Sequence, residues 1–258
     1  MQKRRIESKY SKRLAEERQR VLDRLARFYA PPASKTAAAL MRRSRKVASA
    51  QKPLAWKARE FARTAFLIER GVEREIIAKG IAEKLRKALQ KRASETIQRE
   101  ANKLAKKGVV DHKFLNALEE MVSAKAIGTK EATNIAREYL NIALSNLKLG
   151  SLKKPIEWKL RVLKQLKEIV EIEAELRGFS ERTKKLLLGQ IRGHTFAAIV
   201  KEGEKPKKRI NFSIFELIER AVEEGLIMKD QVELLNAFVI EDYLKAIKAG
   251  RMSSVGIG

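Results

Sequence analysis

Ten basic side chains lie between residues 24 and 59, and this stretch contains no acidic residue. Lysine and arginine at such density can neutralise the phosphates of a polyanion and release its counterions. Without a partner, the same charges repel one another and destabilise a compact chain. Because the commonest polyanion is nucleic acid, we expect these residues to form a nucleic-acid-binding surface. The ten residues are Arg24, Arg27, Lys35, Arg42, Arg43, Arg45, Lys46, Lys52, Lys57 and Arg59.

The positive charge is a regional property of the chain. Residues 1–110 hold 31 basic and 11 acidic side chains, whereas residues 111–258 hold 26 and 21. The formal net charge of +25 therefore arises mainly in the amino-terminal part. This asymmetry favours a dedicated binding segment over a generally basic protein.

The clearest geometry is in a helix expected over residues 34–51, with Ser34 as its cap. At about 100° per residue, basic and small side chains share one face. Those residues are Lys35, Ala38, Ala39, Arg42, Arg45, Lys46 and Ser49. The opposite side carries Leu40 and Val47. A solvated face paired with distant acids is the alternative, but no acid is available locally, so we favour contact with a phosphate backbone.

Reading of base edges is not expected from this stripe, because Asn and Gln are scarce and phosphate-seeking Arg and Lys dominate. The aromatic residues nearby lie on apolar seams, and we interpret them as core side chains, not as platforms for stacked bases. They are Tyr10, Phe28, Tyr29, Trp56, Phe61 and Phe66. Double-stranded nucleic acid is therefore the favoured partner.

A second basic cluster lies in an expected loop and is the weaker candidate for binding. It consists of Lys205, Lys207, Lys208 and Arg209.

No arrangement of residues predicts catalysis. The two histidines, His112 and His194, fall on separate expected helices with no motif linking them. The segment 189–193 has two glycines but lacks the Lys-Ser/Thr ending and the preceding strand of a phosphate loop. Cysteine is absent and no metal-ligand spacing occurs. We expect a protein that is not an enzyme and that holds no cofactor and no metal.

Sparse Gly and Pro predict an all-α fold in which these residues mark helix ends. We expect a basic amino-terminal helix-turn-helix arm, with its turn at Pro31-Pro32, followed by a multi-helix bundle of helical hairpins. Gly71 and Gly108 are expected to end helices, and Gly80 to kink one. The expected domains are 1–110 for nucleic-acid binding, 111–249 for the core and assembly, and 250–258 as a flexible tail. The expected helices are 6–29, 34–51, 53–70, 73–107, 112–125, 130–147, 155–177, 180–202, 213–224 and 231–248.

Two of the expected hairpins lie 100 residues apart and share a faint pattern. The shared pairs are Glu119 and Glu219, Val122 and Val222, and Ile127 and Ile227. Three identities over some thirty positions leave both chance and a true internal duplication open.

The order of elements in residues 1 to about 60 is a basic helix, a Pro-containing turn and a second basic, Ala-rich helix ahead of a helical core. This arrangement resembles the DNA-wrapping coat proteins of filamentous and rod-shaped archaeal viruses. The resemblance implies a nucleocapsid in which many self-assembled subunits enclose double-stranded DNA, and hence a location in the virion. A cytoplasmic or nucleoid-associated architectural protein is the cellular counterpart.

Two other functions remain open. An RNA-binding protein of a ribonucleoprotein particle has the same charge, because the 2′-hydroxyl contacts that distinguish RNA leave no signature in composition. A membrane-surface or partner-binding helical protein would use the apolar side of the helix at 34–51. No stretch approaches the roughly 20 apolar residues of a membrane span, and the chain's start has no apolar signal core, so we expect a protein that is not secreted.

Overall fold

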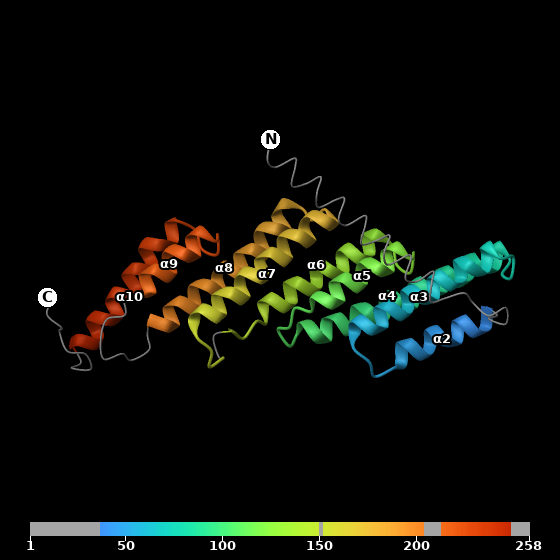
Figure 1. The fold of residues 1–258 in the computed structure, drawn as a ribbon, viewed down its shortest axis with the longest axis horizontal. Coiled ribbons are helices and arrows are strands. Elements are labelled where there is room, and N and C mark those ends of the chain that lie inside the picture. The colour runs from blue at the N-terminus through green and yellow to red at the C-terminus, as the bar shows by residue number, and fades with distance from the viewer. Residues whose placement is uncertain (1–36, 150–151, 204–212, 249–258) are drawn as a thin grey trace. The chain divides into compact units, whose positions relative to one another are not determined.

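The computed structural model describes residues 37–149, 152–203 and 213–248 (Figure 1). Every regular element in these residues is helical, which confirms the expected all-α class for this part of the chain. The helix expected at 6–29, the basic loop and the tail lie outside the described residues. The helices are α2 (Ala37–Ser49), α3 (Leu54–Glu73), α4 (Lys79–Ala105), α5 (His112–Ser123), α6 (Thr129–Ser145), α7 (Ile156–Arg177), α8 (Glu181–Gly203), α9 (Ser213–Glu223) and α10 (Asp230–Lys248).

Proline and glycine mark several of the expected helix ends. Pro53 and Pro155 directly precede α3 and α7, as their fixed φ and missing N–H predict. Gly108 follows the end of α4 with a φ of +68°. The expectation for Gly71 is wrong, because α3 continues through it to Glu73. A Cβ on Gly71 would approach the Ile77 side chain to 2.5 Å, so a larger residue there would force Ile77 to move.

Three hairpin turns, α3–α4, α5–α6 and α9–α10, have the same conformation. Each contains one residue in the left-handed region, and its N–H donates to the carbonyl of a valine three residues earlier at 2.8–2.9 Å. The left-handed residues are Glu75, Lys125 and Gly225, with φ of 58°, 57° and 65°. Two residues later each turn buries an isoleucine: Ile77, Ile127 and Ile227. The pattern that the sequence shows for the α5–α6 and α9–α10 hairpins therefore also occurs in the α3–α4 hairpin.

The four helices α3–α6 recur as α7–α10. The starts of corresponding helices are separated by 102, 102, 101 and 101 residues in chain order. We call α3–α6 the first repeat and α7–α10 the second repeat. Six buried positions of α4 recur as buried positions of α8 at an offset of 102. The pairs are Leu85 and Leu187, Leu89 and Ile191, Ala93 and Thr195, Thr96 and Ala198, Ile97 and Ile199, and Ala101 and Gly203.

The same correspondence holds at the second hairpin of each repeat. Three buried positions of α10 match buried positions of α6 at an offset of 100. The pairs are Ile135 and Leu235, Tyr139 and Val239, and Ala143 and Tyr243. Agreement of turns, helix starts and core positions favours an internal duplication over chance.

The described chain divides into two compact units. The first contains residues 37–103 and 111–138, and the second contains residues 104–110 and 139–248 with the gaps given above. The first unit extends past residue 110 and includes α5, because α5 packs against α3. The buried Phe114, Leu115 and Leu118 show why, since an amphipathic helix must bury its apolar face. In the described ranges no helix is both long enough and apolar enough to cross a bilayer.

Candidate nucleic-acid interface

Helix α2 is held against α3 by a narrow buried stripe. Leu40, Ser44 and Val47 recur at spacings of four and three residues, and all are buried. The Ser44 hydroxyl is fully buried; it donates to the Met41 carbonyl at 2.9 Å and accepts from Arg92 Nη1 at 2.7 Å. This anchoring determines which side of α2 faces outward.

The outward side of α2 carries the expected basic stripe. We call the exposed residues Ala38, Arg42, Arg45, Lys46 and Ser49 the basic face of α2. Lys52 follows the helix and is also exposed. None of these four cations forms an ion pair with a residue that the structure describes. Cations without partners beside small side chains leave room for a phosphate backbone to approach.

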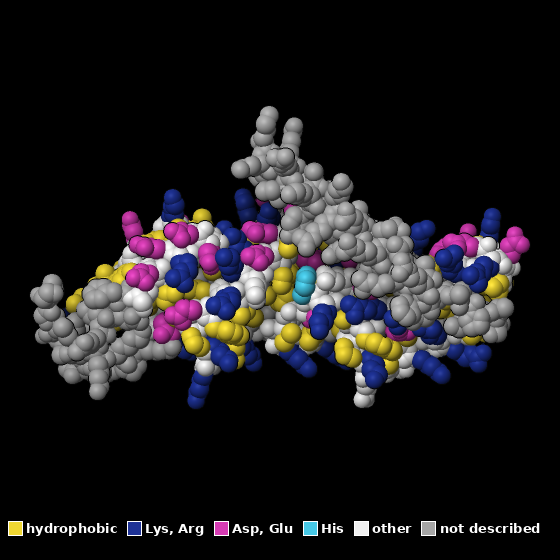
Figure 2. Space-filling view, in the orientation of Figure 1, with side chains coloured by type: hydrophobic (Ala, Val, Ile, Leu, Met, Phe, Trp, Pro, Cys, Tyr) yellow, Lys and Arg dark blue, Asp and Glu magenta, His cyan; other side chains and the backbone are white. Residues whose placement is uncertain are grey.

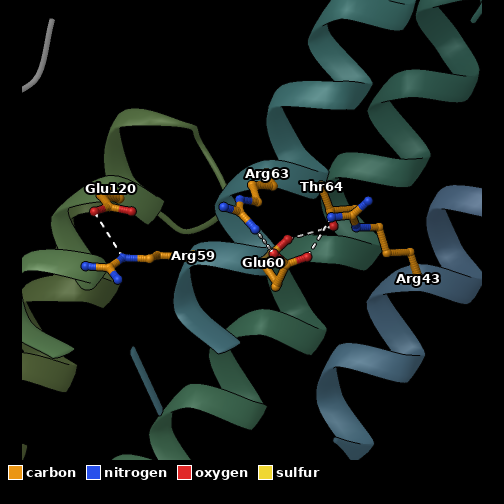
Figure 3. A network of polar contacts seen from close by, with 6 residues as sticks. All are labelled: Arg43, Arg59, Glu60, Arg63, Thr64 and Glu120. Carbon is orange, nitrogen blue, oxygen red and sulfur yellow. Dashed lines mark hydrogen bonds and ion pairs between the residues drawn. The ribbon is translucent and has the colours of Figure 1, made fainter. Parts of the chain in front are cut away.

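Arg43 lies on a different side of α2 and is engaged inside the first unit (Figure 3). Its Nη2 lies 2.6 Å from Oε2 of Glu60, a buried carboxylate of α3. The other oxygen of Glu60 contacts Arg63. For Arg43 the alternative of pairing with a distant acid applies, because α3 places Glu60 beside it from 17 residues away. Arg43 fastens α2 to α3 and is not part of the basic face.

Lys57 is also withdrawn from the candidate surface. It is only 4% exposed, and its Nζ lies 3.4 Å from the Ala48 carbonyl and 3.7 Å from Glu100 Oε1. A buried cation with a carbonyl and a carboxylate partner contributes to packing. Of the ten sequence-predicted cations, Lys57 is therefore one that the structure places in the interior and not on the exposed surface.

Arg59 remains accessible. Its side chain is 45% exposed, and its Nε lies 3.4 Å from Glu120 Oε1 of α5 (Figure 3). An exposed pair at this distance contributes little, at most about 1 kcal/mol, so a phosphate can compete for the arginine. The remaining sequence-predicted residues lie outside the described residues: Arg24, Arg27, Lys35, Lys205, Lys207, Lys208 and Arg209.

A further basic row on α4 was not among the sequence-predicted sites. Lys84, Lys87 and Lys91 are exposed at spacings of three and four residues, which places them on one side of the helix. Glu95 interrupts the row one turn later. The spacing of these lysines could be read from the sequence. The acidic residues on the same helix, however, gave no indication of which side of the helix is exposed.

The two histidines, the side chains considered above for catalysis, lie on different helices. His194 Nε2 lies 2.7 Å from the Leu144 carbonyl and thereby joins α8 to α6. His112 is the exposed first residue of α5, directly after the capping Asp111. The described residues contain no cluster of three or more His, Cys, Asp or Glu that could hold a metal ion.

In the residues that the structure describes, the fold is all-helical: the basic helix α2 packs on α3, and the pattern of α3–α6 recurs in α7–α10. No protein-family model, curated protein or solved structure matches the chain.

Proposed function

We propose that the chain binds the phosphate backbone of double-stranded nucleic acid, with DNA favoured, and packages it without choice of sequence. The observation that carries the proposal is the basic face of α2. Arg42, Arg45 and Lys46 point outward without an acidic partner in the described chain, and Ala38 and Ser49 add no bulk. Such a surface suits close approach to phosphates and carries no side chain that selects a base.

The docking of α2 supports this proposal over a membrane-surface role. A helix that lies on lipid inserts its apolar side into the bilayer. Leu40 and Val47, the aliphatic residues of that side, are 2% and 3% exposed because they pack within the first unit. The outward side that remains is cationic and lacks large apolar groups.

The salt dependence of binding tests the proposal. Replacing Arg42, Arg45 and Lys46 by Ala should reduce the slope of log K against log salt by roughly 0.9 for each phosphate that the variant no longer neutralises. The matched control replaces Arg182, Lys184 and Lys185 of α8 by Ala, which removes the same charge from another helix. If the slope of log K against log salt falls equally in the α2 and α8 variants, or does not change in the α2 variant, the binding site is not on α2.

Competition measurements identify the nucleic acid. Duplex DNA of random and of defined sequence should displace a labelled duplex equally, because backbone contacts carry no sequence information. If duplex RNA displaces the probe more strongly than duplex DNA, the ribonucleoprotein function replaces the packaging one.

We also propose that the chain assembles with further copies of itself through α10. Four large apolar side chains on this helix are 41–52% exposed: Leu234, Phe238, Ile240 and Leu244. Figure 2 shows apolar side chains on this part of the chain. The first-repeat equivalents of Ile240 and Leu244 are Leu140 and Leu144, and both are fully buried.

In the first repeat, the face of α6 that is equivalent to the exposed face of α10 packs against α8. The end of α6 contacts α8 through Gln190 Nε2, which lies 2.9 Å from Asn141 Oδ1 and 3.0 Å from Ser145 Oγ. On α10 the positions of those two partners are Glu241 and Lys245, which pair at 2.8 Å. The hydrogen bond and charge of Lys245 lower the pKa of Glu241. The exposed face is thus mainly apolar, with one neutralised ion pair and with Glu233 near the start of the helix, which suits a second copy of the chain.

Light scattering tests this assembly. Replacing Ile240 and Leu244 by Lys should lower the mass in solution to that of one chain. Replacing Leu186, a 55% exposed residue of α8, by Lys is the control and should leave the mass unchanged. A chain that is already monomeric before substitution would refute the proposal. If both surfaces act, electron microscopy of long duplex DNA with the protein should show continuous filaments, as expected of a nucleocapsid or nucleoid component.

A further inference from the structure

The two repeats begin with nearly the same eight residues. Residues 52–59 read KPLAWKAR and residues 154–161 read KPIEWKLR, so five of eight positions are identical. Both segments also have the same backbone. Pro53 and Pro155 have φ, ψ of −52°, 147° and −53°, 151°, and each carbonyl accepts from the lysine four residues later.

Part of this shared segment is required by the fold. Each proline starts its helix, and the next residue, Leu54 or Ile156, is buried. The second lysines, Lys57 and Lys159, are only 4% and 5% exposed. Packing at the same place in each repeat accounts for these identities.

The remaining identities are at exposed positions, and about a third of each indole surface reaches solvent. Trp56 and Trp158 are 36% and 37% exposed, which also corrects the expectation that Trp56 is a core residue. The first lysine and the arginine are exposed in both segments. Trp and Arg are three residues apart and therefore neighbours on the helix surface. Each segment thus presents an indole between two cations: Lys52, Trp56 and Arg59 in the first, and Lys154, Trp158 and Arg161 in the second.

We infer that these two indole clusters bind unpaired nucleotides of a nucleic-acid strand, one site in each compact unit. An accessible indole stacks on a nucleobase whatever its identity, and flanking Lys and Arg bind the phosphates on either side of that base. In the second cluster Lys154 Nζ lies 6.0 Å from the centre of the Trp158 ring, at the edge of cation–π range. Arg161 makes no ion pair with a described residue.

The clusters differ in two ways. Arg59 shares its charge with Glu120. Glu157 directly precedes Trp158, whereas Ala55 precedes Trp56. Because adjacent residues on a helix point about 100° apart, the Glu157 side chain points away from the indole. Both clusters therefore retain the cations beside the ring. This site goes beyond the proposed function, because its ligand is unpaired and it does not use the basic face of α2.

Intrinsic fluorescence tests the inference directly, because Trp56 and Trp158 are the chain's only two tryptophans. Trp158→Phe and Trp56→Phe each leave one reporter. A thymidine homopolymer should quench both single-tryptophan proteins, because its bases stack on the indole. Trp158→Ala, tested by affinity for the same oligonucleotide, should weaken binding roughly 5- to 150-fold at the second site. Leu186→Ala, which removes another large exposed apolar side chain, is the control and should not weaken it.

Other outcomes overturn the inference. Quenching by inorganic polyphosphate as strong as by the homopolymer would show that no base is bound. A spectral shift with anionic lipid vesicles and none with the homopolymer would indicate a membrane-surface site. A shift that follows protein concentration without ligand would indicate contact between copies of the chain. The variant with Arg42, Arg45 and Lys46 replaced by Ala should retain full quenching, so failure of this site and failure of the α2 proposal are distinguishable.

Discussion

The two repeats share a core but differ in what covers it. On α3 the side that includes Glu60 meets α2 through Arg43, and Ala62 and Ala65 are buried on the opposite side of the helix. The equivalent positions of α7 are Val162, Lys164 and Lys167, all half-buried. There the two lysines bind Glu224 of the α9–α10 turn, at 2.9 Å to its carboxylate and 2.7 Å to its carbonyl. The same side of this helix is therefore lined by buried alanines in the first repeat and by lysines that bind the α9–α10 turn in the second.

The opposite difference occurs at the last helix of each repeat. The face of α6 that includes Leu140 and Leu144 is fully buried, whereas the matching face of α10 is half exposed. Helix α2, which packs on the first repeat, thus carries exposed cations, whereas α10 of the second repeat carries exposed apolar side chains. The two repeats are therefore distinguished by their surfaces and not by their core.

The largest expected effect compares a buried and an exposed copy of one position. Leu140→Glu places a carboxylate without a partner in the interior and should reduce the free energy of unfolding by about 4 kcal/mol or more. Ile240→Glu should change it by less than about 0.5 kcal/mol in the monomer. Urea unfolding measures both, and equal losses would show that the exposed face of α10 is covered within the chain.

The next effect tests equivalence of the two cores. Ile97→Ala and Ile199→Ala each remove a fully buried side chain at matched positions of α4 and α8. Each should reduce the free energy of unfolding by about 2–5 kcal/mol, because less apolar surface is buried and a cavity is left behind. Ile81→Ala, at a half-exposed site of α4, is the control. A tenfold smaller reduction at one matched site would contradict a common core.

A smaller effect concerns the attachment of α2. Glu60→Gln removes the charge that binds Arg43 and Arg63, and Arg43 Nε is already buried without a hydrogen-bond partner. Because both arginines are partly exposed, the free energy of unfolding should fall by about 2 kcal/mol, below the range for a fully buried pair. Hydrogen exchange should show faster exchange in α2 than in α5. Protection of α2 equal to that in the unmodified chain would show that Glu60 does not hold it.

The smallest effect lies in the matched turns. Gly225→Ala should cost about 1 kcal/mol, because a Cβ is disfavoured at a φ of 65° and would approach Lys167 Nζ to 2.9 Å. Lys125→Gly in the equivalent turn should stabilise the chain by about 0.5 kcal/mol, since glycine relieves the same strain but is freer when unfolded. Thermal unfolding of the two variants should shift in opposite directions. Shifts in the same direction would contradict the equivalence of the turns.

Helix boundaries were largely predictable because prolines, glycines and apolar spacing act locally. The starts of α3 and α7 and the stop at Gly108 follow from single residues. Gly71 was misassigned because its role depends on Ile77, which only the folded turn brings near. The grouping of α5 with α3 in one compact unit was not predictable from composition, because their packing joins residues some sixty positions apart.

By itself the sequence determined the helical class, the regional charge and the outward stripe of Arg42, Arg45 and Lys46, because each depends on composition or on the helical period. Only the tertiary structure decided which cations stay exposed. Lys57 and Arg43 carry the same charge as their neighbours, yet Glu100 and Glu60 neutralise them after folding. The exposure of Trp56 and Trp158 was decided in the same way, since burial depends on which helices pack together and not on the residue's own hydrophobicity.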